Sequence, residues 1–190
     1  MRRIALVGEI GSGKTFFSKL FGYPIFNADL VVSKLYQKDK FLFNKIKKKF
    51  PNKVSNFPLK KEELLKIIFQ NKKNLNVLGK LIHPKVRKKM ENFFKTNKRK
   101  KFVVLDVPLY LENRLNKKKD ILIFVAADKK KIKQRLNKRK NINSKLIKIL
   151  RRNQLPILLK RKKSNYVIKN NFIGNTAKKN VKLILKKISK

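Results

Sequence analysis

The sequence contains no cysteine and no tryptophan, a single histidine, and only ten aspartate and glutamate residues in 190 positions. Without cysteine the chain can form neither disulfide bonds nor thiolate metal ligands, and one histidine cannot build a histidine metal site. No apolar run approaches the length of a membrane span, and no signal-type segment precedes the first apolar run. We therefore expect a cytoplasmic protein with no membrane partner.

Acidic residues are also few beside the 54 lysines and arginines, which give a formal net charge of +44. Such a charge attracts polyanions, so nucleic-acid binding is one interpretation. Compositional drift is the other, because lysine is spread over nearly every segment and asparagine, isoleucine and phenylalanine are abundant as well. No nucleic-acid recognition motif and no separate basic arm occurs. We expect no specific nucleic-acid partner, only non-specific polyanion binding.

A phosphate-binding loop is the clearest feature that is present. Residues 8–15 read GEIGSGKT and match G-x-x-x-x-G-K-[ST] at every fixed position, directly after the apolar run 4–7. Glycines allow a close backbone approach to phosphate and positive φ angles, and the loop N–H groups form an anion nest. Lys14 is expected to reach the β- and γ-phosphates of ATP, and the Thr15 hydroxyl to bind Mg²⁺. The predicted ATP-binding residues of this segment are Gly8, Gly11, Ser12, Gly13, Lys14, Thr15 and Phe16.

Two carboxylates follow predicted strands. Asp29 comes after a strand predicted at 24–26, and Asp106 ends one predicted at 102–105. If the first two strands are neighbours in a parallel sheet, Asp29 lies near the γ-phosphate, where it would be the base for an attacking hydroxyl. Capping of the next helix is the alternative role. Asp106 stands where phosphate-loop proteins hold Mg²⁺ directly or through water.

The remaining segments predict strands at 121–125 and 166–168, a mainly helical region from 30 to 101, and a final helix at 175–188. We expect His83 to form a turn or a helix cap beside Pro84, and Arg87 to meet a phosphate or to be solvated. Residues 139–163 contain ten basic residues and no acid. That composition is typical of a lid over phosphates or of a solvated basic helix pair.

Taken together, the segments resemble the dephospho-CoA kinase family along nearly the whole chain. The motifs HPKVR at 83–87, LDVPL at 105–109 and YVIKNN at 166–171 carry the resemblance, because many enzymes share the loop. It implies transfer of the ATP γ-phosphate to the ribose 3′-hydroxyl of dephospho-CoA, which gives CoA and ADP in the final step of coenzyme A synthesis. It also implies an α/β, three-layer P-loop NTPase fold with a five-stranded parallel sheet, a helical acceptor-binding insertion and a lid.

The resemblance also implies an organisation and residue roles. The nucleotide-binding core is residues 1–28, 100–138 and 164–190; the acceptor-binding insertion is 29–99; the basic lid is 139–163. The implied catalytic residues are Asp29 as base, Lys14, and Arg139 of the lid, which also contacts ATP. The implied acceptor contacts are Asp29, His83, Arg87 and Asp106. Mg²⁺ would be held by Thr15 and by Asp106, the latter directly or through water. The oligomeric state is not predicted.

Several positions depart from the family pattern. Glu9 replaces a glycine of the loop, and its carboxylate must turn outward or pair with a nearby lysine to avoid repelling phosphates. Asn27, Lys140, Asn165 and Lys169 replace acids, in the same direction as the compositional drift.

Two other functions stay open from the residues. A kinase of the nucleoside-monophosphate type shares the loop and the lid, but its acceptor is a phosphate, so it needs Asp29 less as a base. A basic nucleic-acid-binding protein on the same fold would bind RNA with a steep salt dependence and without turnover.

Overall fold

The computed structural model describes residues 1–71, 73–138 and 144–189. The chain divides into two units. The first consists of Met1–Asn27 and Asn97–Lys190, and the second of Ala28–Thr96. Each unit contains buried apolar side chains of its own and is described by itself.

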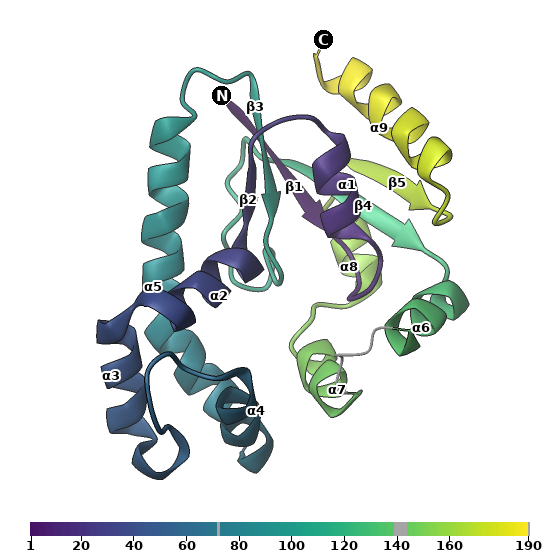
Figure 1. Cartoon of the computed structure of the whole chain (residues 1–190). Helices are drawn as coiled ribbons and strands as arrows, with labels where there is room; N and C mark the ends of the chain where they lie inside the picture. The colour runs from purple at the N-terminus through teal and green to yellow at the C-terminus, as the bar shows by residue number, and fades with distance from the viewer. Residues whose placement is uncertain (72, 139–143, 190) are drawn as a thin grey trace. The chain divides into compact units, whose positions relative to one another are not determined.

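A five-stranded parallel sheet is the centre of the first unit (Figure 1). Its strands, in the spatial order β2-β3-β1-β4-β5, are β1 (Arg2–Val7), β2 (Ile25–Asn27), β3 (Phe102–Asp106), β4 (Ile121–Ala127) and β5 (Tyr166–Asn170). The central strand β1 is buried on both faces from Ile4 to Val7. This burial explains why β1 is a continuous apolar run instead of an alternating one. The five strands and the parallel α/β class predicted from the sequence are confirmed.

The pairing of β2 with β1, on which the placement of Asp29 near the γ-phosphate was conditional, does not occur. β2 pairs with β3 instead of β1, so that Asn27 stands opposite Asp106, and β3 pairs with β1 on its other side. The order of strands in the chain does not reveal this insertion. The physical reason lies in the sequences: β3 is buried at all five positions and suits the sheet interior, whereas the three-residue β2 suits an edge.

The helices of the first unit are α1 (Lys14–Leu20), α6 (Lys129–Asn137), α7 (Ser144–Arg152), α8 (Ile157–Lys162) and α9 (Gly174–Ser189). Both α1 and α9 cover the same face of the sheet and contact each other (Figure 1). On α9 the buried residues recur every three or four positions, which gives the helix one apolar face. This arrangement fixes α1, and the loop that precedes it, above the ends of the central strands.

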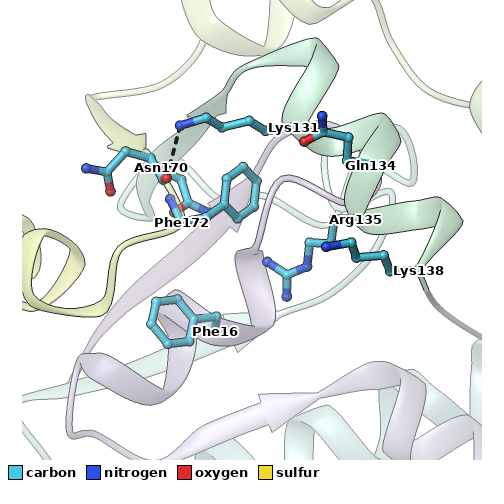
Figure 2. Close-up of a pocket in the computed structure, with 8 residues that line it drawn as sticks. Phe16, Lys131, Gln134, Arg135, Lys138, Asn170 and Phe172 are labelled. Atoms are coloured by element: carbon cyan, nitrogen blue, oxygen red, sulfur yellow. Dashed lines mark hydrogen bonds between the residues drawn. The ribbon is translucent and has the colours of Figure 1, made fainter.

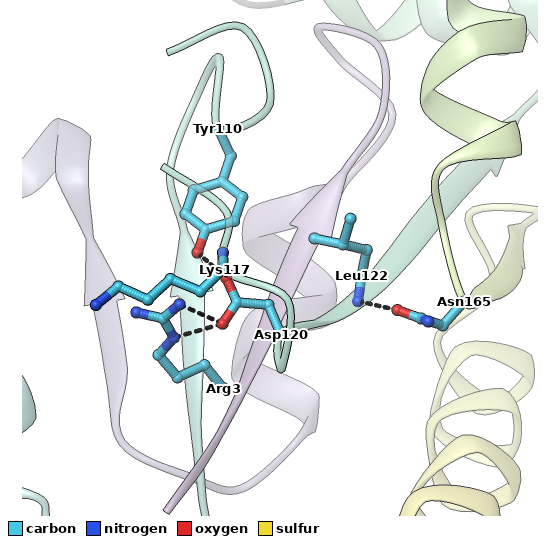
Figure 3. A network of polar contacts seen from close by, with 6 residues as sticks. All are labelled: Arg3, Tyr110, Lys117, Asp120, Leu122 and Asn165. Atoms are coloured by element: carbon cyan, nitrogen blue, oxygen red, sulfur yellow. Dashed lines mark hydrogen bonds and ion pairs between the residues drawn. The ribbon is translucent and has the colours of Figure 1, made fainter. Parts of the chain in front are cut away.

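A buried polar network ties the first strand to the segment between β3 and β4 (Figure 3). Asp120 is 7% exposed and accepts hydrogen bonds from Arg3 Nε at 2.5 Å, Tyr110 Oη at 2.6 Å and Lys117 N at 2.7 Å. A guanidinium nitrogen of Arg3 also forms an ion pair with it. Burial and the hydrogen bond to Asp120 raise the pKa of Tyr110, so the phenol stays a donor. The carboxylate is thus satisfied by three partners.

Asn165 joins β4 to the start of β5 (Figure 3). Its Oδ1 accepts from Leu122 N at 2.8 Å, and its own N–H donates to Leu122 O at 2.9 Å. Because the amide oxygen accepts the bond that a carboxylate oxygen would accept, replacement of an acid by asparagine preserves this strand contact.

The second unit is helical, as predicted. It contains α2 (Ala28–Lys38), α3 (Lys40–Lys49), the short 3-10 helix η1 (Pro51–Lys53), α4 (Lys61–Gln70) and α5 (Lys73–Thr96). α2, α3 and α4 each pack against α5. Asp39 links two of them, because it accepts from Leu42 N at the start of α3 (2.8 Å) and from Lys85 Nζ of α5 (2.6 Å). Burial opposes ionisation of Asp39, but these bonds and the nearby lysine charges hold its pKa below the usual value.

The turn or helix cap expected at His83 and Pro84 is wrong, since both lie inside α5. Proline removes one backbone donor from a helix and normally disfavours its interior. Here Leu78, Ile82 and Met90 are buried on either side of Pro84, so packing holds the helix together through the proline.

Among the helices in the described part of the chain, none has the length and hydropathy that a membrane crossing requires.

We predict that Asp120→Ala lowers the free energy of unfolding by about 3 kcal/mol or more, because it leaves the Arg3 guanidinium and the Tyr110 hydroxyl without this buried acceptor. Denaturant unfolding followed by circular dichroism measures the loss. The matched control is Asp128→Ala, which removes an exposed cap of α6 that accepts from Lys131 N at 3.0 Å and should cost about 1 kcal/mol. Equal losses in the two variants would contradict the prediction.

Candidate nucleotide-binding site

The phosphate loop lies between β1 and α1 and packs closely on the ends of two other strands. Gly8 has φ +149°, and a Cβ there would stand 2.8 Å from the carbonyl oxygen of Val125 in β4. Gly13 has φ +99°, and its Cβ would stand 2.4 Å from Nδ2 of Asn170 in β5. A Cβ at either position would force the neighbouring atoms to shift, and the positive φ angles are strained for any residue with a side chain. The loop therefore needs glycine for its own packing as well as for access to a phosphate.

Asn170 fixes the loop to β5. This side chain is 4% exposed; its Nδ2 donates to Ser12 O at 2.7 Å and its Oδ1 accepts from Phe172 N at 2.9 Å. Ser12 is buried too, and its hydroxyl has no hydrogen-bond partner among the described residues. Asn170 was not among the site residues predicted from the sequence. Its place at the end of a strand, inside a family motif, is the signal that could have found it.

Lys14 folds back over the loop. Its ammonium donates to Glu9 O at 2.9 Å and to Gly8 O at 3.3 Å. Thr15 and Phe16 follow on α1 and are exposed. This arrangement can bind a polyphosphate, because the Lys14 ammonium lies against the loop backbone and the Thr15 hydroxyl is at the start of α1.

Glu9 pairs with an arginine, not with a lysine. Its Oε1 lies 3.0 Å from a guanidinium nitrogen of Arg151, at the end of α7. The Glu9 side chain is 17% exposed and that of Arg151 is 45% exposed. The sequence indicated that this carboxylate needs a neutralising partner, and the structure supplies one from the segment predicted as the lid.

A second acid supports the end of α7. Glu112 Oε1 accepts from Leu155 N at 3.0 Å and forms an ion pair of 2.7 Å with Lys160 Nζ, whose side chain is 3% exposed. Glu112 thus fixes the chain between α7 and α8.

A pocket of about 510 Å³ lies beside the loop (Figure 2). Its walls come from α1, from α6 and its C-cap, and from the end of β5 with the segment that follows: Phe16, Lys131, Gln134, Arg135, Lys138, Asn170, Asn171 and Phe172. The Arg135 guanidinium lies 5.4 Å from the centre of the Phe172 ring, and Lys131 Nζ donates to Asn171 O at 3.4 Å across the pocket. Flat cationic and aromatic groups of this kind suit an aromatic base. Of these residues, only Phe16 was predicted to bind ATP.

Asp106 is at the carboxyl end of β3 and is 4% exposed. Its Oδ2 accepts from Asn27 Nδ2 at 2.8 Å. An aspartate at position 27 would place a second carboxylate against Asp106, so the asparagine found here replaces a repulsive contact with a hydrogen bond.

No group of three or more His, Cys, Asp or Glu residues that could hold a metal occurs within residues 1–71, 73–138 and 144–189.

The other predicted site residues belong to the second unit or lie outside the described residues. Asp29 is exposed in the first turn of α2. His83 and Arg87 are on α5, where a Cβ on Gly79 would lie 3.2 Å from the His83 ring. Partial burial, and then the charge of Arg87, lower the pKa of His83, so the imidazole is neutral at pH 7. Arg139, with Lys140, lies outside the described residues.

The fold and the loop define a nucleotide-binding protein of the phosphate-loop class. A family model for dephospho-CoA kinase matches residues 2–175. The dephospho-CoA kinase of Wolbachia sp. subsp. Brugia malayi (strain TRS) is 36% identical over 170 residues, which cover 87% of each chain. That of Bacillus anthracis is 31% identical over 193 residues, covering 97% of this chain and 96% of the relative. The chain belongs to the dephospho-CoA kinase family, and it is a kinase that uses ATP.

Solved structures show the same fold. The dephospho-CoA kinase from Campylobacter jejuni superposes with a TM-score of 0.66 at 22% identity, over 98% of this chain and 97% of that one. The protein TT1252 from Thermus thermophilus gives a TM-score of 0.77 at 24% identity, with the same coverage. The resemblance found in the sequence motifs is confirmed.

We predict that Gly13→Ala weakens ATP binding and lowers the free energy of unfolding by about 1–2 kcal/mol or more, because a side chain at this positive φ is strained and its Cβ meets Asn170. ATP titration and denaturant unfolding measure the two effects. Gly174→Ala is the control, since no atom lies within 4 Å of a Cβ there. If Gly13→Ala kept the parent's ATP affinity, this account of the loop would be wrong.

Proposed function

We propose that this chain transfers the γ-phosphate of ATP to the ribose 3′-hydroxyl of dephospho-CoA, giving CoA and ADP, as the final step of coenzyme A synthesis in the cytoplasm. Family membership supports the acceptor. The observation that carries the ATP site is the glycine loop pressed against β4 and β5, with the Lys14 ammonium held over it.

On the ATP side, the backbone N–H groups of residues 8–15 and Lys14 bind the β- and γ-phosphates. The adenine enters the pocket beside the loop, against Phe16, Arg135 and Phe172. The pocket volume of about 510 Å³ is in the usual range for small-molecule sites. Since phosphoryl transfer needs positioning and charge stabilisation above all, a fixed loop and a fixed cation supply much of the chemistry.

The residues present fit a Mg²⁺ ion. The Thr15 hydroxyl and the Asp106 carboxylate are hard oxygen donors, the kind this ion prefers. Asp106 would hold the ion directly through Oδ1 or through water, since its Oδ2 accepts from Asn27. The described residues hold no acid cluster, which suits an ion bound largely by phosphate oxygens and water. A bound Mg²⁺ would supply positive charge that offsets the negative charge of the phosphates.

On the acceptor side, the Asp29 carboxylate accepts the proton of the 3′-hydroxyl as the oxygen attacks the γ-phosphorus. Arg87, His83 and Asp106 bind the acceptor. The lowered pKa of His83 makes it a neutral hydrogen-bonding group, so Arg87 provides the positive charge of the pair. Arg139 contributes charge toward the transferred phosphoryl group.

We predict that ADP release from Mg-ATP is confined to dephospho-CoA when dephospho-CoA, AMP and buffer are compared as acceptors, and that Asp29→Asn lowers kcat by about 10²-fold or more, as for loss of a general base. Asp128→Asn, at an exposed acid of α6, controls for loss of one negative charge. Turnover with AMP would favour a nucleoside-monophosphate-type kinase. Salt-dependent RNA binding without turnover on any acceptor would favour a nucleic-acid-binding protein.

A further inference from the structure

Residue 9 of the phosphate loop holds two cations at once. Its backbone oxygen accepts from Lys14 Nζ at 2.9 Å, and its carboxylate is 3.0 Å from the guanidinium of Arg151. We propose that Arg151 is a phosphate-binding residue for ATP, and that Glu9 is the positioning residue that holds it beside the loop. The inference rests on the proposed function only in that it takes ATP as the loop's ligand.

The helix that carries Arg151 is fixed without help from Glu9. Glu112 holds the chain just after α7 through Leu155 N and through Lys160, whose side chain is 3% exposed. Arg151 therefore leaves a supported helix end, and the ion pair with Glu9 decides only where its side chain points. Glu9 holds the Arg151 side chain at the loop, and Glu112 holds the chain that follows α7. Together these contacts restrict the movement of the guanidinium.

The guanidinium can serve both partners. It carries five N–H donors in a rigid fork, and it pairs with Glu9 through a terminal nitrogen. The side chain is 45% exposed, so donors remain accessible to a phosphate. A carboxylate alone at position 9 would repel a triphosphate, whereas pairing with Arg151 neutralises that charge and leaves guanidinium N–H donors for a phosphate.

This placement is unusual in so basic a chain. Only ten acids are available, and one of them stands in the loop that must bind an anion. If the acid were merely tolerated, its removal would improve ATP binding. If it positions Arg151, its removal would weaken ATP binding, and the two cases can be separated by measurement.

The test is the dissociation constant for ATP and for ADP, without acceptor, in the parent and in Arg151→Gln, Glu9→Gln and the double variant. Arg152→Gln, one residue along on α7, controls for the loss of a positive charge. We expect Arg151→Gln to raise the Kd for ATP about tenfold, as for loss of a charge-assisted hydrogen bond, and the Kd for ADP less. Arg152→Gln should change both less than about twofold.

Glu9→Gln should raise the Kd for ATP by a smaller factor, and the double variant should match Arg151→Gln, because Glu9 acts through Arg151. Arg151→Lys keeps the charge but not the fork, and should lie between the parent and Arg151→Gln. Tighter ATP binding in Glu9→Gln, a double variant restored to the parent's Kd, or an Arg151→Gln indistinguishable from Arg152→Gln would overturn the inference. Since no acceptor is present, these outcomes do not depend on the identity of the phosphorylated substrate, which turnover of the parent tests separately.

Discussion

The site depends on one close contact, the packing of the phosphate loop onto the carboxyl ends of β4 and β5. The side chain of Asn170 is the central element, since it donates to Ser12 O and leaves no room for a Cβ on Gly13. The strand order puts β4 beside β1 and β5 beside β4, so the loop after β1 lies against the carboxyl ends of both strands. α1 and the pocket beside it then take their positions from the loop, because Phe16 is two residues beyond Lys14 and Phe172 is two residues beyond Asn170.

Several of the ten acids join segments that lie far apart in the chain. Asp120 collects three donors at the other end of the sheet, Glu112 holds the chain after α7, Asp39 joins two helices of the second unit, and Glu9 pairs with Arg151. In a chain with a formal charge of +44, mutual repulsion of lysines opposes compactness. A few acids at buried junctions oppose that repulsion where it matters most, so each is harder to replace than an acid on a mixed surface.

The sequence predicts the repetitive and local features of this molecule well. The apolar runs locate all five strands, and the loop pattern locates Lys14 and the glycines, since strand burial and tight turns leave direct marks on residue type. It fails where distant segments meet. The insertion of β3 between β1 and β2 and the pairing of Glu9 with Arg151 depend on tertiary packing. The continuation of α5 through Pro84 also depends on tertiary packing, because its buried neighbours outweigh the tendency of proline to end a helix. Asn170 could be predicted only in part: the sequence shows the motif that contains it, but not its hydrogen bond to the phosphate loop.

The central claim is that the γ-phosphate of ATP is delivered to one particular hydroxyl. The most direct measurement is the identity of the product formed from Mg-ATP and dephospho-CoA, determined by proton–phosphorus correlation NMR. The account predicts a new phosphomonoester whose phosphorus correlates with the ribose H3′, together with one ADP for each product molecule. A phosphate attached at another position, or ADP accompanied only by inorganic phosphate, would contradict it.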